Sequence, residues 1–176
     1  MMIKSSKKRN ISEIGSECER KFQEWLDNNF ISFIRVDQEP QTYARQFRGH
    51  VKRPDYKIII TDIGNIFVDA KSREMYSNFA TFVIDESDIV MLSNFQKDCN
   101  TPVWLALSSK SFAYKTWFWI SINDILLKLK PRLSSKSNDS FFAIPVDKCK
   151  LLGSNDGLNR LIEKHEISTP AFRNSM

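Results

Sequence analysis

Two short runs rich in β-branched residues, 56–60 and 66–71, flank a five-residue segment that contains a Gly-Asn pair. Gly and Asn are typical of hairpin turns, so the two runs are predicted to pair as antiparallel strands. Side chains alternate along a strand, and Asp69 and Lys71 are therefore expected on one face of the second strand. This hairpin constrains the fold most, because it requires a sheet and displays an acid and a base side by side.

The length of the turn also sets the expected register of the hairpin, with Ile60 opposite Ile66. In that register Asp55 lies opposite Lys71 and diagonal to Asp69, on the same face. Two carboxylates within about 7–8 Å across neighbouring strands repel each other. A hard divalent cation with oxygen ligands relieves such repulsion. The pattern therefore predicts a magnesium site, and a lysine beside it suits phosphodiester hydrolysis.

Helical and extended segments alternate on both sides of the hairpin. The first helix carries its apolar residues on one stripe, which includes Cys18, Phe22 and Trp25. The order of elements predicts one mixed α/β fold. The predicted helices span residues 12–29, 85–100 and 123–130, and the predicted strands or extended segments span residues 30–36, 80–84, 103–107 and 116–121.

Three parts are distinguished along the chain. Residues 1–11 are predicted to form a basic N-terminal arm, residues 12–131 the core of the fold, and residues 132–176 a C-terminal extension packed on that core. In the extension, a loop rich in Ser and Asn precedes a predicted strand at 141–146 and an amphipathic segment at 158–165.

Charge and composition exclude several classes of protein. Thirteen Phe and four Trp supply enough core material to exclude intrinsic disorder. The chain has 26 Lys and Arg against 21 Asp and Glu, a net charge of +5 that is compatible with a polyanionic partner such as nucleic acid.

The cysteines and the N-terminus indicate the cellular compartment. Cys18, Cys99 and Cys149 are widely spaced and form no Cys/His cluster, so neither a zinc site nor a disulfide framework is expected. No apolar stretch follows the basic N-terminus, and no run is long enough to span a bilayer. We expect a cytoplasmic protein without a membrane partner.

The hairpin motif resembles a known superfamily. Pro54-Asp55, followed by Asp69-Ala70-Lys71, is similar to the motif of the PD-(D/E)xK nucleases. Upstream, the Gly-Ser-Glu-Cys-Glu-Arg sequence at 15–20 opens a helix, as in archaeal-type Holliday junction resolvases, whose first helix bears an acidic metal-site residue. The similarity covers residues 15–120. It implies a restriction-endonuclease-like fold with an αβββαβ core, a magnesium-dependent DNA endonuclease activity on duplex or branched DNA, and a homodimer.

The resemblance also implies the role of each site residue. In that family the two strand carboxylates, here Asp55 and Asp69, hold Mg²⁺, for which Mn²⁺ substitutes. The backbone carbonyl between acid and lysine, here that of Ala70, completes the ligand set, and Lys71 assists the attacking water. Some resolvases carry a Gln on the helix after the lysine strand, whereas this sequence has Asp88 at that place.

The acid of the first helix is chosen by its position around the helix axis. Glu17 shares a polar face with Lys21 and is expected to pair with it in solvent. Glu19 borders the apolar stripe, from where it can point across the sheet towards Asp55 and Asp69. Glu19 is therefore the predicted catalytic and metal-binding acid, and Glu17 is the alternative.

A basic segment precedes the motif and is predicted to contact the DNA backbone. A solvated loop is the alternative interpretation. His50 in this segment is expected to take no part in catalysis, and Trp117 and Trp119 are expected in the core. The predicted DNA-binding residues are Arg45, Arg48, Lys52, Arg53 and Arg73.

Two other functions remain open at the level of the sequence. One is a nucleic-acid-binding or accessory protein that keeps the nuclease fold without its activity. The other is a restriction-type enzyme that shares the site but cuts only defined duplex sequences.

Overall fold

The computed structural model describes residues 3–42, 44–61, 64–135 and 137–162. Its largest element is a six-stranded sheet with the strand order β1-β2-β3-β5-β6-β9. Strands β3 and β5 pair in parallel and the other neighbours pair antiparallel. The strands of this sheet are β1 (Phe33–Arg35), β2 (Tyr56–Ile60), β3 (Gly64–Ser72), β5 (Val103–Ser108), β6 (Trp117–Ser121) and β9 (Lys150–Leu152).

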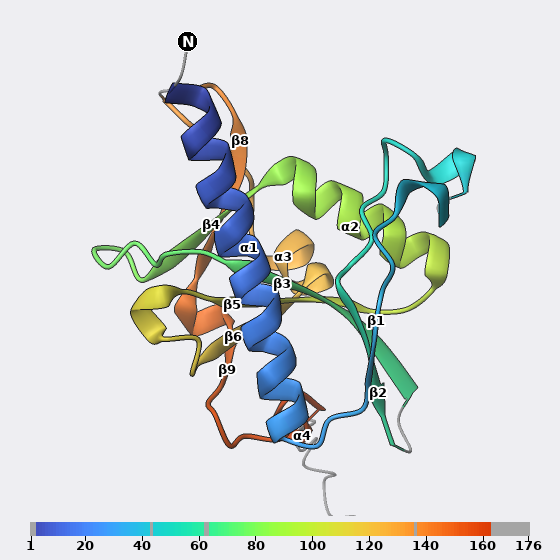
Figure 1. Cartoon of the computed structure of the whole chain (residues 1–176). Coiled ribbons are helices and arrows are strands. Elements are labelled where there is room, and N and C mark those ends of the chain that lie inside the picture. Colours follow the sequence, from blue (N-terminus) through green and yellow to red (C-terminus); the bar gives the residue numbers. More distant parts are fainter. Residues whose placement is uncertain (1–2, 43, 62–63, 136, 163–176) are drawn as a thin grey trace, which may run out of the picture.

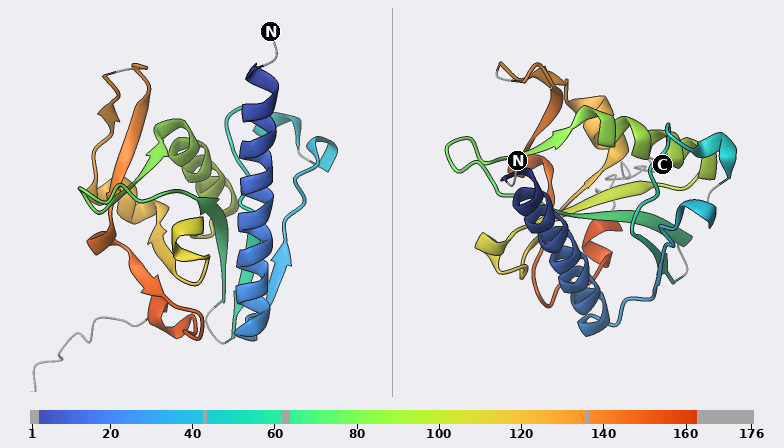
Figure 2. Two further views of the ribbon diagram at one scale, coloured as in Figure 1. Left: turned by 60° about the vertical axis from the view of Figure 1, so that its left-hand side comes forward. Right: turned by 45° about the horizontal axis from the view of Figure 1, so that its top comes forward.

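Helices cover both faces of this sheet (Figures 1 and 2). Helix α1 (Ile3–Asn28) crosses one face, and α2 (Glu86–Cys99) and α3 (Ile122–Lys128) lie on the other. Each face has its own apolar core. The predicted mixed α/β architecture is confirmed, and the chain runs in αβββαβ order if β4, which joins a different sheet, is set aside.

Helix α1 packs its predicted apolar stripe against the sheet. Cys18, Phe22, Trp25 and Leu26 are all buried there, and the ring of Phe22 contacts aromatic rings from β2 and β6. The helix starts at Ile3, so most of the segment predicted as a separate basic arm belongs to α1. A periodic stripe of apolar residues marks only the part of a helix that packs on the sheet. It therefore does not predict helical turns that extend beyond the sheet.

The hairpin forms as predicted, but its register differs. Ile58 lies opposite Ile66, and Ile60 pairs with Gly64. The strand begins at Gly64 because glycine tolerates the positive φ of 130° at that position. The turn is therefore shorter than expected, and extending the register past the Tyr56–Val68 pair brings Asp55 level with Asp69, not with Lys71.

A second sheet of three strands, in the order β4-β8-β7, joins the middle of the chain to its C-terminal part. Its strands are β4 (Thr81–Asp85), β7 (Arg132–Leu133) and β8 (Ser140–Pro145). Together with β9, which extends the main sheet beside β6, they integrate residues 132–133, 140–145 and 150–152 into the fold. Helix α4 (Asn159–Ile162) lies within the predicted amphipathic segment, and the rest of that segment lies outside the described residues.

No helix in the described part of the chain is long and apolar enough to cross a membrane. The three cysteines are free thiols, as predicted, and Cys18 is buried in the core beneath α1. Trp117 and Trp119 are also buried, which confirms their assignment to the core.

Candidate active site

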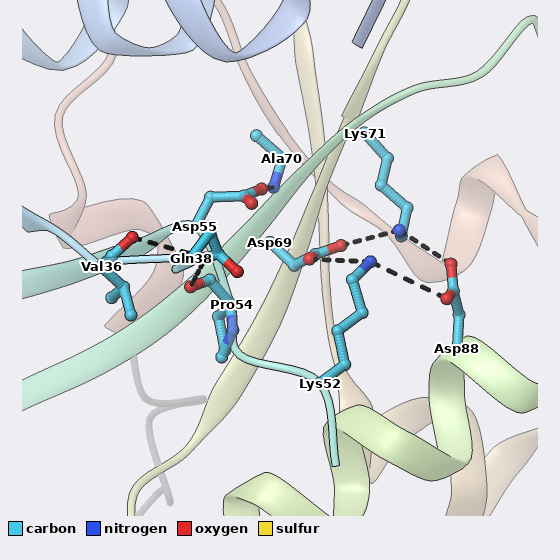
Figure 3. Close-up of polar contacts among 9 residues, drawn as sticks. All are labelled: Val36, Gln38, Lys52, Pro54, Asp55, Asp69, Ala70, Lys71 and Asp88. Carbon is cyan, nitrogen blue, oxygen red and sulfur yellow. Dashed lines mark hydrogen bonds and ion pairs between the residues drawn. The ribbon is translucent and has the colours of Figure 1, made fainter. Parts of the chain in front are cut away.

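The predicted motif residues line one open cleft with a volume of about 570 Å³. Its walls come from α1, from the segment before β2 and from the C-terminal half of β3. Figure 3 shows the polar contacts around Asp55 and Asp69. The lining residues that matter below are Glu19, Gln38, Lys52, Asp55, Asp69, Ala70, Lys71 and Arg73.

Strand β3 places Asp69 and Lys71 on one face, as expected from alternation. This face looks towards α2, because the neighbouring Leu105 and Leu107 of β5 belong to the core on that side. Asp69 is 1% exposed. A carboxylate buried this deeply needs charged or hydrogen-bonding partners.

Asp55 ends the segment that enters β2. Its Oδ2 accepts a hydrogen bond of 2.8 Å from the backbone N–H of Ala70, which ties it to β3. Gln38 steadies the same segment by donating to the carbonyl of Pro54 at 3.1 Å (Figure 3). Burial, and then the nearby carboxylate of Asp69, raise the pKa of Asp55 to about 7. The carboxylate of Asp69 therefore disfavours the ionised form of Asp55.

Two lysines and two aspartates form a closed ring of ion pairs (Figure 3). Lys71 Nζ lies 3.0 Å from Asp69 Oδ2 and 2.8 Å from Asp88 Oδ2. Lys52 Nζ lies 3.2 Å from Asp69 Oδ1 and 3.8 Å from Asp88 Oδ1. Asp88 comes from the first turn of α2, so the ring joins that helix to β3.

The ring fixes the charge of Lys71. Burial by itself lowers the pKa of a lysine, but the carboxylates of Asp69 and Asp88 outweigh it and raise the pKa of Lys71 above its usual range. For Asp88 the balance is the reverse: burial raises its pKa, and Lys71 and Lys52 lower it overall. Lys71 is thus an ammonium ion at neutral pH, able to donate hydrogen bonds but not to accept a proton.

The two candidate acids of α1 have different environments. Glu19 lines the cleft, and its backbone carbonyl accepts a 2.9 Å hydrogen bond from the hydroxyl of Tyr56. Its carboxylate lies 2.9 Å from Arg35 of β1. Glu17 pairs with Lys110 at 3.0 Å. The predicted pairing of Glu17 with Lys21 is wrong, because Lys21 binds Glu24 one turn further along the same helix.

The predicted DNA-binding residues do not share one environment. Arg45 and Arg48 are exposed on the loop, whereas Arg53 donates to Thr42 Oγ1 and the Glu39 carbonyl and so helps to shape it. Arg73 lines the cleft next to the motif. Lys52 belongs to the ring of ion pairs and is therefore part of the site itself.

The described residues hold no group of three or more His, Cys, Asp or Glu side chains placed to bind a metal ion. The oxygen atoms in the cleft nevertheless suit a metal ion as ligands. Asp69 Oδ2 is buried and, although Lys71 Nζ is near it, has no partner in hydrogen-bonding geometry. With Asp55 nearby and the carbonyl of Ala70 between acid and lysine, hard oxygen donors are available, as Mg²⁺ requires.

Sequence reasoning did not assign a role to Asp88 and placed Lys52 at the DNA interface. The sequence places Asp88 on the helix after the lysine strand, but nothing in the sequence predicts its ion pairs with Lys52 and Lys71. His50 is exposed, and its backbone carbonyl accepts a hydrogen bond from Asn94 of α2.

No protein-family model matches this chain, and no curated protein matches it. Among solved structures, the chain is similar to Hjc, a Holliday junction resolvase from the archaeal hyperthermophile Archaeoglobus fulgidus. The two share 14% sequence identity and a TM-score of 0.48, over 74% of this chain and 88% of the resolvase. The chemistry of the cleft therefore has to be judged from its own residues.

Proposed function

We propose that this protein is a magnesium-dependent endonuclease that hydrolyses phosphodiester bonds in DNA, of the resolvase-like kind. One observation carries the proposal: the buried carboxylate of Asp69 and the half-buried carboxylate of Asp55 lie in one cleft with the ammonium of Lys71. A purely structural role explains this poorly, because buried ion pairs contribute little net stability compared with apolar residues of similar size.

Asp55, Asp69 and the backbone carbonyl of Ala70 would hold the magnesium ion, with Glu19 as an additional acid on the wall of the cleft. The ion would lower the pKa of the attacking water and stabilise charge on the phosphate. Lys71 would assist by donating hydrogen bonds, since it is cationic and cannot act as a general base. Its ammonium would orient the water or counter the charge that develops on the phosphoryl oxygens.

Cationic side chains around the cleft would hold the DNA backbone. Arg73 lines the cleft itself, and Arg45 and Arg48 extend the positive charge along the loop before β2. Such contacts position the substrate without reading its sequence. Whether two copies of the chain act together, as the resemblance implies, stays a prediction.

A cleavage assay with plasmid, linear and branched DNA in Mg²⁺ tests the activity. We expect the wild-type protein to cut at least one substrate and Asp69→Asn to lose about 10³-fold or more in rate, the scale of losing a main electrostatic contributor. Lys130→Met, at an exposed site outside the cleft, is the matched control. A wild-type protein as inert as Asp69→Asn on all substrates contradicts the proposal.

The second candidate is a nuclease-fold protein that binds nucleic acid without cutting it. The ion pairs of Lys52 and Lys71 favour it, because both ammonium groups already neutralise Asp69. Calorimetric titration with Mn²⁺ separates the two functions. Binding that disappears in Asp55→Ala supports the endonuclease, whereas salt-sensitive DNA binding with no dependence on metal supports the binding protein.

A further inference from the structure

Lys52 occupies an unusual position for a residue of a basic loop. Its backbone N–H donates to the carbonyl of Met91 in α2 at 3.3 Å, and its neighbour Val51 is buried in the core beneath that helix. The carbonyl of His50 is also held by Asn94 of α2. These contacts fix the backbone at Lys52 beside the cleft, so that its side chain reaches Asp69.

The two ammonium groups of the ring are held differently. Lys71 is 10% exposed and makes its shorter contact, 2.8 Å, with Asp88. Lys52 is 31% exposed and lies closer to Asp69, at 3.2 Å, than to Asp88, at 3.8 Å. Lys52 is therefore the less buried of the two charges, and it neutralises the oxygen of Asp69 that Lys71 does not contact.

A divalent cation on Asp69 and an ammonium ion on the same carboxylate repel each other at close range. The cation can bind only when Lys52 withdraws, and Asp88 is the carboxylate already within reach of its Nζ. A short movement within the ring would transfer Lys52 from one aspartate to the other and keep its charge paired. No other carboxylate among the described residues forms an ion pair with Lys52.

We propose that Lys52 is a tethered counter-ion that competes with the divalent cation for Asp69, and that Asp88 is the positioning residue that receives Lys52 when the cation binds. The inference rests on the proposed metal-dependent function and adds a control of cation affinity to it. It also gives a physical reason for an aspartate at the start of α2.

Calorimetric titration of the whole protein with MnCl₂, without DNA, tests the competition. We expect Lys52→Met to bind Mn²⁺ at least about fivefold more tightly than the wild type, the lower range of coupling between sites in proteins. Lys130→Met removes the same charge from an exposed site and is expected to leave the affinity unchanged. Thermal melting of each variant verifies that it is folded.

Asp88→Asn tests the receiving role. With only Asp69 left for Lys52, we expect Mn²⁺ to bind at least about fivefold more weakly than in the wild type. In the Lys52→Met background the same substitution is expected to have a smaller effect. Additive effects in this double-mutant cycle would mean that both charges act independently at a distance, and they would overturn the transfer of Lys52 to Asp88.

The outcomes separate this inference from the proposed function. If the wild type binds Mn²⁺ and Lys52→Met binds it equally well, the competition is refuted and the metal-dependent function stands. If neither the wild type nor Lys52→Met binds Mn²⁺, the metal-dependent function is refuted as well. Tight binding by Lys52→Met with undetectable binding by the wild type supports both.

Discussion

Strand β3 buries both of its faces, but with opposite kinds of side chain. Val68 and Ala70 face α1 and join an apolar core, whereas Asp69 and Lys71 face α2 and join the ring of ion pairs. Apolar burial is favourable by itself, at about 25 cal/mol per Å². Buried charges lose their hydration, and only well-placed charged or hydrogen-bonding partners offset the free energy that this costs. Both faces of the sheet have an apolar core, so on β3 itself Val68 and Ala70 contribute to stability, whereas Asp69 and Lys71 are expected to serve chemistry.

Phe22→Ala tests the apolar face and should have the largest effect on stability. The ring is fully buried among the aromatic residues of the α1 face, so its removal leaves a cavity. We expect a loss of about 4 kcal/mol in urea-induced unfolding. Phe30→Ala, at a residue that is 96% exposed, is the control and should change stability by less than about 0.5 kcal/mol. Similar losses in the two variants would contradict the assignment of this core.

The double variant Asp69→Asn/Asp88→Asn tests the charged face. Both lysines then lack a carboxylate in the ring, and an uncompensated buried charge costs about 3 kcal/mol or more. Asp69→Asn alone should cost less, because Asp88 still contacts Lys52 and Lys71. Urea denaturation of the single and double variants measures the difference. If the double variant is as stable as the wild type, the ring makes no contribution to folding.

Asp55→Asn should stabilise the metal-free protein at pH 8. The rise in the pKa of Asp55 corresponds to about 4 kcal/mol, at about 1.4 kcal/mol for each pKa unit, and solvent around this half-buried side chain should reduce the effect to roughly 2 kcal/mol. The pKa of Asp55 is raised to about 7 from an ordinary value of 3.8. Folding therefore favours its protonated form, and the wild type loses stability as the pH rises from about 4 through 7. The advantage of Asp55→Asn should vanish near pH 4.

Unfolding in EDTA at several pH values measures this effect. If Asp55→Asn is more stable than the wild type by the same amount at every pH, ionisation of Asp55 does not destabilise the folded protein. Restoration of wild-type stability by Mn²⁺ at pH 8, without a matching gain in Asp55→Asn, would link the same carboxylate to the cation.

Arg35→Gln should have the smallest effect. The pair between Arg35 and Glu19 lies at the rim of the cleft, with side chains that are 63% and 33% exposed. Exposed pairs are screened by solvent, so we expect a change of less than about 0.5 kcal/mol in thermal or urea unfolding. A loss above 1 kcal/mol would mean that the rim is coupled to the fold as strongly as the ring.

Local signals in the sequence were enough to predict most of the main sheet and its helices. The apolar stripe of α1 and the alternation along β3 both record direct packing, so they predicted the core and the shared face of Asp69 and Lys71. The register was wrong because Gly64 was assigned to the turn, whereas its tolerance of a positive φ lets it begin the strand.

Long-range contacts could not be predicted in the same way. The three-residue strand β9 is too short for a pattern, and it forms because β6 offers it an edge. The ring of ion pairs also depends on tertiary structure: Lys52 and Asp88 approach each other only because the segment before β2 packs along α2. Polar residues in loops carry no periodicity that reveals such neighbours.

The pairing of the short edge strand β9 with β6 has a consequence for how the chain is made. Until Lys150–Leu152 leave the ribosome, the outer edge of β6 has exposed backbone hydrogen-bonding groups. An unpaired edge of this kind favours association with other unfinished chains. A fragment that ends at residue 131 would keep the whole cleft yet carry this edge permanently, so we expect it to aggregate during expression.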